Sequence, residues 1–341
     1  MTAIEPVRWG ILGAANIAVK KVVPAMRRSP GSRVVAIASR SIEKARTAAV
    51  ELDIPRAYGS YEELIADAEV EAIYIPLPNH LHVPWSIRAA QAGKHVLCEK
   101  PIALSAAEAR TLLAARDRHG VQVAEAFMVR AHPQWHEVER LIGAGRIGEL
   151  RLVTGHFSYY RRDPSDIRSV PEWGGGALMD IGCYPIFIAR WMFGSEPTDV
   201  AAMLDRDPDF GIDRLTSGML RFPNGQAVFT CGGQLVPYQR VHLYGERGRL
   251  EVEIPFNAPP DAPARIYVDD GAALGGRGAS VIDIPIADQY REQAERFAAA
   301  VRGAGTVAVS LEAAVANMAV IDALCRAADT RQWERVGVAT G

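Results

Sequence analysis

The sequence predicts an α/β protein whose first half is a doubly wound parallel sheet and whose second half contains an antiparallel sheet. Two observations lead to this prediction. Short apolar runs alternate with helix-like segments up to about residue 127, and longer strand-like runs joined by turns follow. The length of 341 residues favours two domains, which we place at residues 1–128 and 129–341.

Composition argues against several partners and compartments. The formal net charge is −2 and like charges form no block, which argues against nucleic acid or a membrane surface as a partner. No apolar run could span a bilayer, and no basic stretch precedes an apolar core at the N-terminus. The four cysteines form no Cys-x-x-Cys pair, and His132 and His136 lack a third metal ligand. We therefore expect a reduced, cytoplasmic protein without a bound metal.

The first strand–turn–helix unit indicates a phosphate-binding site. A buried strand over residues 7–12 is followed by Gly13 and by a helix expected over residues 19–28. In such a unit the amides at the helix N-terminus point at an anion. Ala15 and Ala18 replace the second and third glycines of the dinucleotide fingerprint, so an ordinary strand–turn–helix stays a rival interpretation. The candidate cofactor contacts here are Gly13, Ala15, Asn16 and Ile17.

The end of the second strand favours NADP over NAD. An NAD-binding unit would place Asp or Glu after the strand at residues 34–38, to accept hydrogen bonds from the ribose. The chain has Ser39-Arg40-Ser41 there instead, and an arginine can pair with a 2′-phosphate. We take Ser39, Arg40 and Lys44 as candidate contacts. The alternative is a solvated loop arginine.

Alternation of helices and strands continues to the end of the first half. Helices are expected over residues 43–52, 61–66, 81–92 and 105–119, and strands over 72–75, 95–98 and 121–127. Ser105 and Glu108 form a capping-box pattern at the start of the last of these helices. The proline-stiffened loop after residue 75 lies where a cofactor would bind. Its candidate contacts are Pro76, Leu77, Asn79 and His82.

A lysine stands where the strand at residues 95–98 leaves the sheet. The sequence there is Glu99-Lys100-Pro101. Ligands of open α/β sheets bind beyond the carboxyl ends of the strands, and a partly buried lysine titrates readily. Lys100 is therefore a candidate catalytic residue and Glu99 a candidate cofactor contact. A solvated loop lysine before a helix-starting proline is the alternative.

The second half reads as an antiparallel sheet with a few helices. Strands are expected over residues 150–160, 199–204, 213–222, 227–233, 240–244 and 248–254, and helices over 133–142, 177–193, 290–302 and 311–328. Asn224-Gly225 predicts a hairpin. Residues 161–173 read as a substrate or cofactor loop, and residues 255–280 as an exposed excursion rich in Pro and Gly.

Four segments resemble the Gfo/Idh/MocA family of oxidoreductases, which includes glucose-fructose oxidoreductase and inositol dehydrogenase. These segments are residues 9–18, 74–82, 93–101 and 174–184. The resemblance covers nearly the whole chain. It implies a dinucleotide-binding Rossmann domain and a substrate-binding and oligomerisation domain with an open, mostly antiparallel sheet. It also implies hydride transfer between nicotinamide and a sugar-like substrate, and a homodimer or homotetramer formed through the open sheet.

The resemblance draws attention to Asp180 and Tyr184, which are four residues apart and would share one helix face. Oxidation of an alcohol needs a proton acceptor, and a tyrosine serves if a nearby ammonium, here Lys100, favours its phenolate. Asp180 would position a substrate hydroxyl. A tyrosine at 184 resembles the glucose-fructose oxidoreductase and dihydrodiol or xylose dehydrogenase branch, which tends to use NADP. A helix N-terminal charge and a core aromatic are the alternatives.

Two further residues resemble family positions that line the nicotinamide or the pyrophosphate, Arg168 and Tyr290. The function predicted from all these residues is that of an NADP-dependent oxidoreductase acting on a sugar, polyol or related cyclic alcohol or ketone. One alternative is redox-activated cleavage of a glycosidic bond, as in some relatives. Another is a regulator that binds NADPH without turnover, although such a sensor would need none of Lys100, Asp180 and Tyr184.

Overall fold

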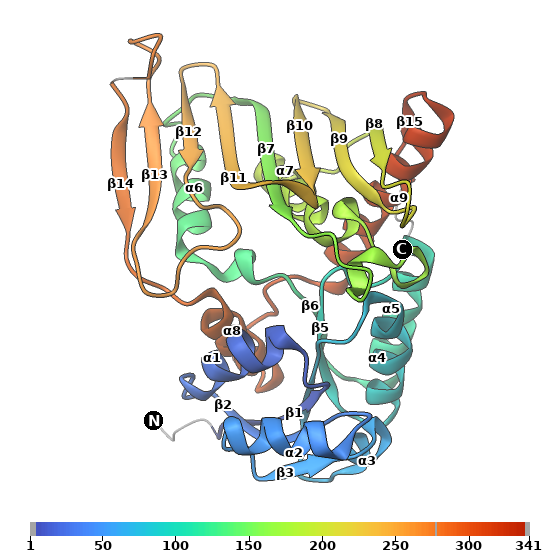
Figure 1. Ribbon diagram of the computed structural model, residues 1–341. Helices are drawn as coiled ribbons and strands as arrows, with labels where there is room; N and C mark the ends of the chain where they lie inside the picture. Colours follow the sequence, from blue (N-terminus) through green and yellow to red (C-terminus); the bar gives the residue numbers. More distant parts are fainter. Residues whose placement is uncertain (1–4, 277, 338–341) are drawn as a thin grey trace. The chain divides into compact units, whose positions relative to one another are not determined.

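The computed structural model describes residues 5–276 and 278–337 (Figure 1). These residues form two compact units. Unit 1 runs to Ala131 and includes Asp288–Val315, and unit 2 comprises His132–Ala287 and the residues from Ala316 on. The division expected at residue 128 assigns the helix near residue 290 to the second domain. That helix, α8 (Gln289–Val301), instead belongs to unit 1, because Ala294, Phe297 and Ala298 are buried in the core of that unit.

Unit 1 contains a parallel sheet of six strands in the order β3-β2-β1-β4-β5-β6. Every described pair of neighbours in it is parallel, as the alternation of strands and helices predicts. The strands are β1 (Val7–Leu12), β2 (Ser32–Ala38), β3 (Arg56–Tyr58), β4 (Ala72–Ile75), β5 (His95–Glu99) and β6 (Val123–Ala126). Only β3 has no counterpart in the prediction, because three residues are too few to show a pattern.

Apart from the short segment η3, the helices of unit 1 follow the predicted segments closely. They are η1 (Ala18–Val22), α1 (Val23–Arg27), α2 (Ile42–Glu51), α3 (Tyr61–Ala66), η2 (Asn79–Leu81), α4 (His82–Gln91), α5 (Ala106–His119), η3 (Met128–Ala131) and α8. The predicted cap of α5 is present, since Ser105 accepts a hydrogen bond from the Glu108 amide at 3.2 Å. The Glu108 carboxylate accepts from the amide of Leu104, one residue earlier than a standard capping box requires.

Apart from β3, the strands of unit 1 are mostly buried, because helices cover the sheet. Trp9 on β1 and Phe297 on α8 are fully or almost fully buried, with ring centroids 5.2 Å apart. Burial of both faces explains why these strands are continuous apolar runs. The strand order reverses between β1 and β4, so these two neighbours mark the switch point at which such sheets bind ligands.

Unit 2 contains a nine-stranded sheet in the order β14-β13-β12-β11-β7-β10-β9-β8-β15. Among its described pairs, β10 and β7 are parallel and the others are antiparallel, so the sheet is mostly antiparallel, as expected. The strands are β7 (Leu150–Tyr160), β8 (Asp199–Arg206), β9 (Asp213–Phe222), β10 (Gly225–Gly232), β11 (Gln234–Gly245), β12 (Gly248–Val252), β13 (Ala264–Asp269), β14 (Ser280–Ile284) and β15 (Glu334–Arg335).

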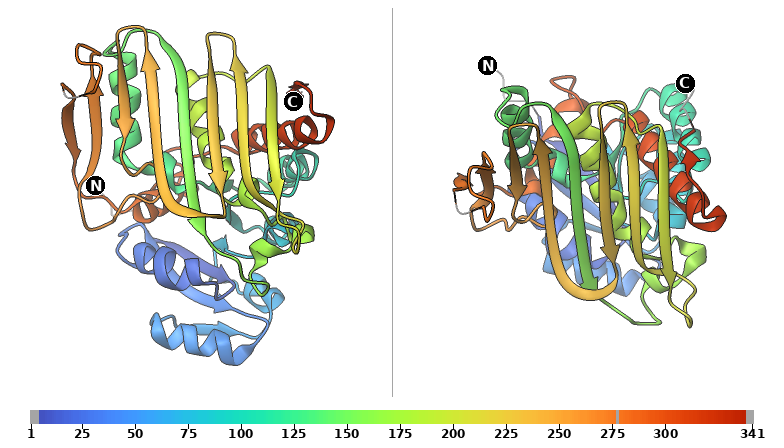
Figure 2. Two further views of the ribbon diagram at one scale, coloured as in Figure 1. Left: turned by 45° about the horizontal axis from the view of Figure 1, so that its top comes forward. Right: turned by 90° about the horizontal axis from the view of Figure 1, so that it is seen from above.

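Helices pack on one face of this sheet. Figure 2 shows α6 (Pro133–Gly143) and α7 (Cys183–Phe193) behind the strands, with the other face of the sheet toward the viewer. The remaining helical segments are η4 (Ile167–Ser169), η5 (Pro171–Trp173), η6 (Leu178–Gly182) and α9 (Leu311–Thr330), which begins in unit 1. No helix among the described residues is long and apolar enough to cross a membrane.

Two predictions for unit 2 need correction. The expected excursion at residues 255–280 contains β13 and the start of β14, because buried Ala264, Ile266 and Val268 alternate along β13. The flanking Pro and Gly residues obscure that short alternation. The hairpin predicted from Asn224-Gly225 does join β9 to β10. Phe222 pairs with Gly225, however, so the two-residue loop is Pro223-Asn224, and Asn224 does not have the positive φ of a type I′ turn.

Candidate active site

The loops after β1 and β4 touch each other at the switch point of unit 1. Gly13 follows β1 and has a φ of 129°. A Cβ atom at this position would lie 2.9 Å from Leu77 Cδ2 in the loop after β4. A glycine is therefore needed for both the backbone conformation and the contact. Two of the predicted cofactor contacts are thus brought together at the edge where a dinucleotide is expected.

The turn after Gly13 fits a pyrophosphate. Helical backbone begins at Asn16, which is exposed, while Ala15 and Ile17 are partly exposed. The Ala15 carbonyl accepts from the Val19 amide at 3.0 Å, so the chain enters a helix directly after the glycine turn. This arrangement directs amides at an anion even though Ala15 stands where the fingerprint has a glycine.

The end of β2 presents an exposed guanidinium. Arg40 is exposed, and Ser39 before it is buried and accepts from the Ser41 amide at 3.4 Å. Ser41 caps α2 by accepting from the amide of Lys44, whose side chain is exposed. Burial lowers the pKa of His80, and the nearby Arg40 charge lowers that pKa further. The Arg40 guanidinium therefore lies close to the loop after β4.

One predicted contact of that loop has a different role from the expected one. The His82 side chain is fully buried, with one ring nitrogen 2.7 Å from the Leu77 carbonyl and the other 2.8 Å from the Pro101 carbonyl. Burial lowers the pKa of His82 to about 4, so the ring is neutral near pH 7 and donates to one of these carbonyls. His82 therefore joins two loops and offers no ring nitrogen to a cofactor. Pro76 is buried and Asn79 is partly exposed.

The turn after β5 gathers three of the predicted residues. The Tyr74 hydroxyl donates to Glu99 Oε1 at 2.6 Å, and the Lys100 amide donates to Glu99 Oε2 at 3.2 Å. The peptide bond between Lys100 and Pro101 is cis. Burial raises the pKa of Tyr290, the nearby Glu99 charge raises it further, and the Lys100 charge lowers it. The Tyr290 ring of α8 thus lies near both Glu99 and Lys100.

In unit 2, the glycine-rich segment before α7 is held by a residue that the sequence reasoning missed. Gly176 has a φ of 111°, and a Cβ atom there would lie 1.9 Å from Asp213 Oδ1. The other carboxylate oxygen of Asp213 accepts from the Leu178 amide at 2.8 Å and from the Thr216 hydroxyl at 2.6 Å. Asp213 on β9 therefore caps the helical segment that carries Asp180. No local pattern links residues 35 positions apart, so the sequence offered no signal.

Asp213 should give the protein an unusual pH dependence. Burial raises its pKa from the ordinary 3.8 to about 6, so between these values the folded state holds a proton that the unfolded state releases. The contribution of Asp213 to the free energy of unfolding should therefore fall as pH rises from about 4 to 6, by roughly 3 kcal/mol. Asp213→Asn keeps an acceptor but removes the titration. Urea unfolding of both proteins at several pH values tests this, and a pH-independent difference between them would contradict it.

Asp180 is fixed by two neighbours in its own unit. Its Oδ2 atom accepts from the Tyr159 hydroxyl at 2.6 Å and from Arg168 Nε at 2.8 Å. The Asp180 charge raises the pKa of Arg168 further above its usual range. Arg168, a predicted cofactor contact, is thus engaged with Asp180, and its amide donates to Asp166. Tyr159 was missed because it lies on β7, 21 residues before Asp180, and no local pattern links the two.

Tyr184 is buried in an aromatic cluster. Its ring centroid lies 5.6 Å from that of Phe157 and 5.4 Å from that of Phe256. Asp180 lies in the π-helical segment η6, whereas Tyr184 lies in α7. The expectation that both share one face assumed a continuous α-helix. A π-turn inserts an extra residue, so the four-residue spacing does not by itself align them, and such turns are frequent at functional sites.

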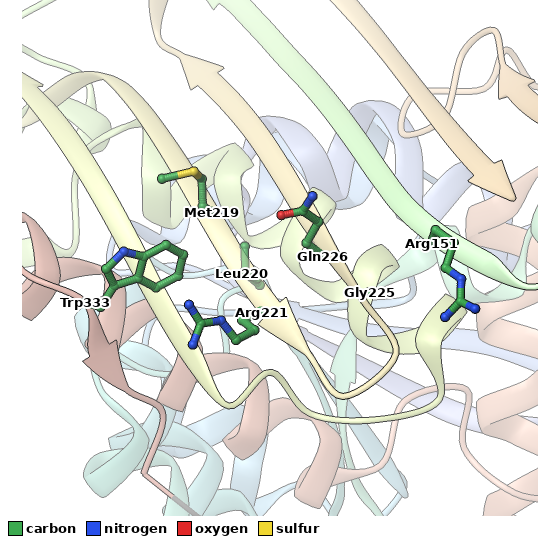
Figure 3. Close-up of a pocket in the computed structure, with 7 residues that line it drawn as sticks. All are labelled: Arg151, Met219, Leu220, Arg221, Gly225, Gln226 and Trp333. Atoms are coloured by element: carbon green, nitrogen blue, oxygen red, sulfur yellow. The ribbon is translucent and has the colours of Figure 1, made fainter. Parts of the chain in front are cut away.

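Unit 2 also has a pocket away from these residues. It is shown in Figure 3 and contains none of the predicted site residues. Its lining residues are Arg151, Met219, Leu220, Arg221, Gly225, Gln226 and Trp333. Arg151 and Arg221 both have carboxylate partners, Glu246 and Asp199. Within the described part of the chain, no three His, Cys, Asp or Glu side chains gather as a metal site.

Comparison with known proteins identifies the family. Residues 7–127 match the model of an oxidoreductase family with an NAD-binding Rossmann fold, and residues 135–251 match the GFO/IDH/MocA C-terminal domain. The chain belongs to the Gfo/Idh/MocA family of oxidoreductases. As a member of this family it is an NAD(P)-dependent dehydrogenase or reductase.

Several relatives match over nearly the whole chain. An uncharacterized oxidoreductase of Rhizobium meliloti is 49% identical, over 98% of this chain and 100% of the relative. D-xylose 1-dehydrogenase (NADP(+)) 2 of Haloferax volcanii is 40% identical, over 94% of this chain and 97% of the relative. A 3-ketoreductase from Actinomadura kijaniata, solved in complex with NADP and TDP-benzene, is 30% identical with a TM-score of 0.88, and the match covers 95% of this chain and 98% of that chain.

Proposed function

We propose that the protein is an NADP-dependent oxidoreductase that transfers a hydride between nicotinamide and a sugar, polyol or related cyclic alcohol or ketone. The Glu99-Lys100 turn carries this proposal. It lies at the end of β5, on the carboxyl edge of the parallel sheet, the edge at which sheets with this strand order bind their ligands. The names of the xylose dehydrogenase and the 3-ketoreductase support the same class of substrate.

The proposed preference for NADP rests on Arg40. In a Rossmann unit the end of β2 faces the adenosine ribose, and a carboxylate there would repel a 2′-phosphate. Ser39, Arg40 and Ser41 provide hydroxyls and an exposed guanidinium instead. An arginine fork matches a phosphate group geometrically, so the Arg40 guanidinium can donate hydrogen bonds to it.

Three side chains would carry the chemistry. Bound nicotinamide would accept or supply the hydride. In the oxidation direction, the Tyr184 phenolate would take the proton of the reacting hydroxyl. A nearby ammonium would favour that phenolate, and Lys100 is our candidate for it. Asp180 positions a substrate hydroxyl, while Tyr159 and Arg168 fix the orientation of its carboxylate. The same groups would protonate a carbonyl oxygen in the reverse direction.

We also propose that a second copy of the chain covers the open face of the nine-stranded sheet. Large apolar side chains are exposed on the neighbouring strands β8, β9 and β10 and on β11, which β7 separates from β10: Met203, Met219, Val228, Val236 and Tyr238. Apolar groups spread over one sheet face are typical of a subunit interface. This arrangement would give a homodimer or homotetramer.

Thermal unfolding with NADPH, NADH, NADP and NAD tests the cofactor preference. A ligand at a hundred times its dissociation constant adds about 2.7 kcal/mol of stability, and we expect this for NADP(H) first. Arg40→Asp should weaken NADP(H) binding by roughly 10- to 100-fold and spare NAD(H), because a charge pair is replaced by repulsion. Arg33→Asp is the matched control, since Arg33 is exposed at the other end of β2.

A preference for NAD(H), or equal effects of the two arginine substitutions, would contradict the NADP proposal. If NADP(H) is preferred, aldoses, polyols and cyclic ketones are then screened by the absorbance of the reduced nicotinamide. Net reduction or oxidation of the cofactor by one of them is the expected result. Glycoside cleavage without any net change in the cofactor would favour the redox-activated alternative instead.

A further inference from the structure

Three buried side chains hold the turn that carries Lys100. The Tyr74 hydroxyl donates to Glu99 Oε1 at 2.6 Å, directly before the lysine. A ring nitrogen of His82 lies 2.8 Å from the Pro101 carbonyl, directly after it. Glu125 Oε1 accepts from the Ile102 amide at 2.9 Å, one residue further on. The residue before Lys100 and the two residues after it are thus each hydrogen-bonded to a buried side chain.

These side chains come from three elements that surround β5. Tyr74 lies on β4 and Glu125 on β6, the two strands that pair with β5, and His82 begins α4. Tyr74 and His82 are fully buried and Glu125 is 2% exposed. Burying a hydroxyl, an imidazole and a carboxyl group costs free energy unless each has a polar partner. An apolar core at these positions would serve a purely structural sheet at no such cost.

We propose that Tyr74, His82 and Glu125 are positioning residues that fix the backbone of Lys100 for its role in proton transfer. This inference rests on the proposed function of Lys100. Reacting groups must be held to within a fraction of an ångström, and a misplacement of about 1 Å can cost roughly a hundredfold in rate. Holding the residues on both sides of Lys100 fixes the backbone from which its side chain extends.

Glu125 allows the most specific test, because its hydrogen-bond acceptor can be removed while the size of the side chain is kept. Glu125→Gln keeps a carbonyl oxygen that can accept from the Ile102 amide, whereas Glu125→Met has a similar size and no such acceptor. In hydrogen–deuterium exchange of the whole protein without ligand, the amide of Ile102 should exchange at least about tenfold faster in Glu125→Met, since it loses its acceptor. Glu125→Gln should stay close to the original protein.

Steady-state kinetics with NADP and a sugar that the enzyme accepts then test whether the hydrogen bond between Ile102 and Glu125 matters for catalysis. We expect Glu125→Met to lower kcat by roughly 10- to 100-fold with little change in the NADP dissociation constant, and Glu125→Gln to restore most of the loss. The pH profile of kcat/KM should shift in Glu125→Met. Tyr74→Phe should lower kcat in the same way. Its matched control is Tyr58→Phe, which removes a hydroxyl bonded to Asp67 in the same unit at 3.0 Å.

A purely structural role predicts other results. It would lower the melting temperature but leave kcat per folded molecule and the pH profile of kcat/KM unchanged. If Glu125→Met leaves kcat per folded molecule unchanged, or leaves the pH profile unchanged, the proposal is overturned. Equal kcat values for Glu125→Gln and Glu125→Met would overturn it too. Failure of the proposed function is distinct from these outcomes, because it would show as full turnover in Lys100→Ala, whatever the exchange rate at Ile102.

Discussion

Replacement of Lys100 by alanine should reduce kcat by roughly 10²- to 10⁴-fold, the usual contribution of a positioned proton-transfer group. Tyr184→Phe should cause a loss of similar size, because it removes the phenolic oxygen that we propose exchanges the proton. Both variants should still bind NADP(H) to within a few-fold, since the phosphate and ribose contacts proposed above lie on other strands. Steady-state kinetics, with intrinsic fluorescence titration of NADPH, measures both quantities.

Lys94→Ala is the control for this prediction. Lys94 lies just before the opposite end of β5, where its ammonium group donates to the carbonyls of Asp67 and Val70. Its loss should lower the melting temperature and leave kcat of the folded enzyme unchanged. Full turnover in both Lys100→Ala and Tyr184→Phe would refute the assignment of the catalytic groups. Loss of NADPH binding in both would point to a structural role for these residues.

Unit 1 was predictable because its signals are local. Apart from β3, each strand is a short apolar run that ends at a recognisable turn or loop, and parallel strands bring these turns to one edge of the sheet. Gly13, Arg40, Leu77 and Lys100 could therefore be assigned to the same edge without knowledge of any contact. The role of His82 could not be derived in this way. It depends on the Pro101 carbonyl, 19 residues further along the chain, and a fully buried histidine has the same local sequence as an exposed one.

Unit 2 was less accessible to sequence reasoning. The neighbours of Asp180 illustrate the difficulty, because Tyr159 precedes it by 21 residues and reaches it from a different element. Asp213 acts from a neighbouring strand on a helix start. The sequence also showed no sign of the π-helical segment η6, since the spacing of Asp180 and Tyr184 is compatible with a regular helix. Hydrogen bonds between distant elements and local helix irregularities follow from packing, which one sequence pattern does not encode.

The largest effect on stability is expected at Gly176. Gly176→Ala should lower the free energy of unfolding by about 3 to 5 kcal/mol, because two costs add. An alanine at a φ of 111° is strained, and its Cβ atom would displace the Asp213 carboxylate from 1.9 Å. Moving that carboxylate breaks buried hydrogen bonds to the Leu178 amide and the Thr216 hydroxyl. Urea unfolding followed by circular dichroism measures the loss.

Gly194→Ala separates these two costs. Gly194 ends α7 with a φ of 60°, and nothing lies within 4 Å of the Cβ position there, so only the conformational cost of about 1 kcal/mol should be seen. Adding Asp213→Ala to Gly176→Ala should recover part of the loss, because the colliding carboxylate is gone. Similar losses for Gly176→Ala and Gly194→Ala would show that Asp213 can move aside. In that case the glycine would be required by backbone conformation alone, and the start of the helix that carries Asp180 would be less rigid than the proposed role of Asp180 requires.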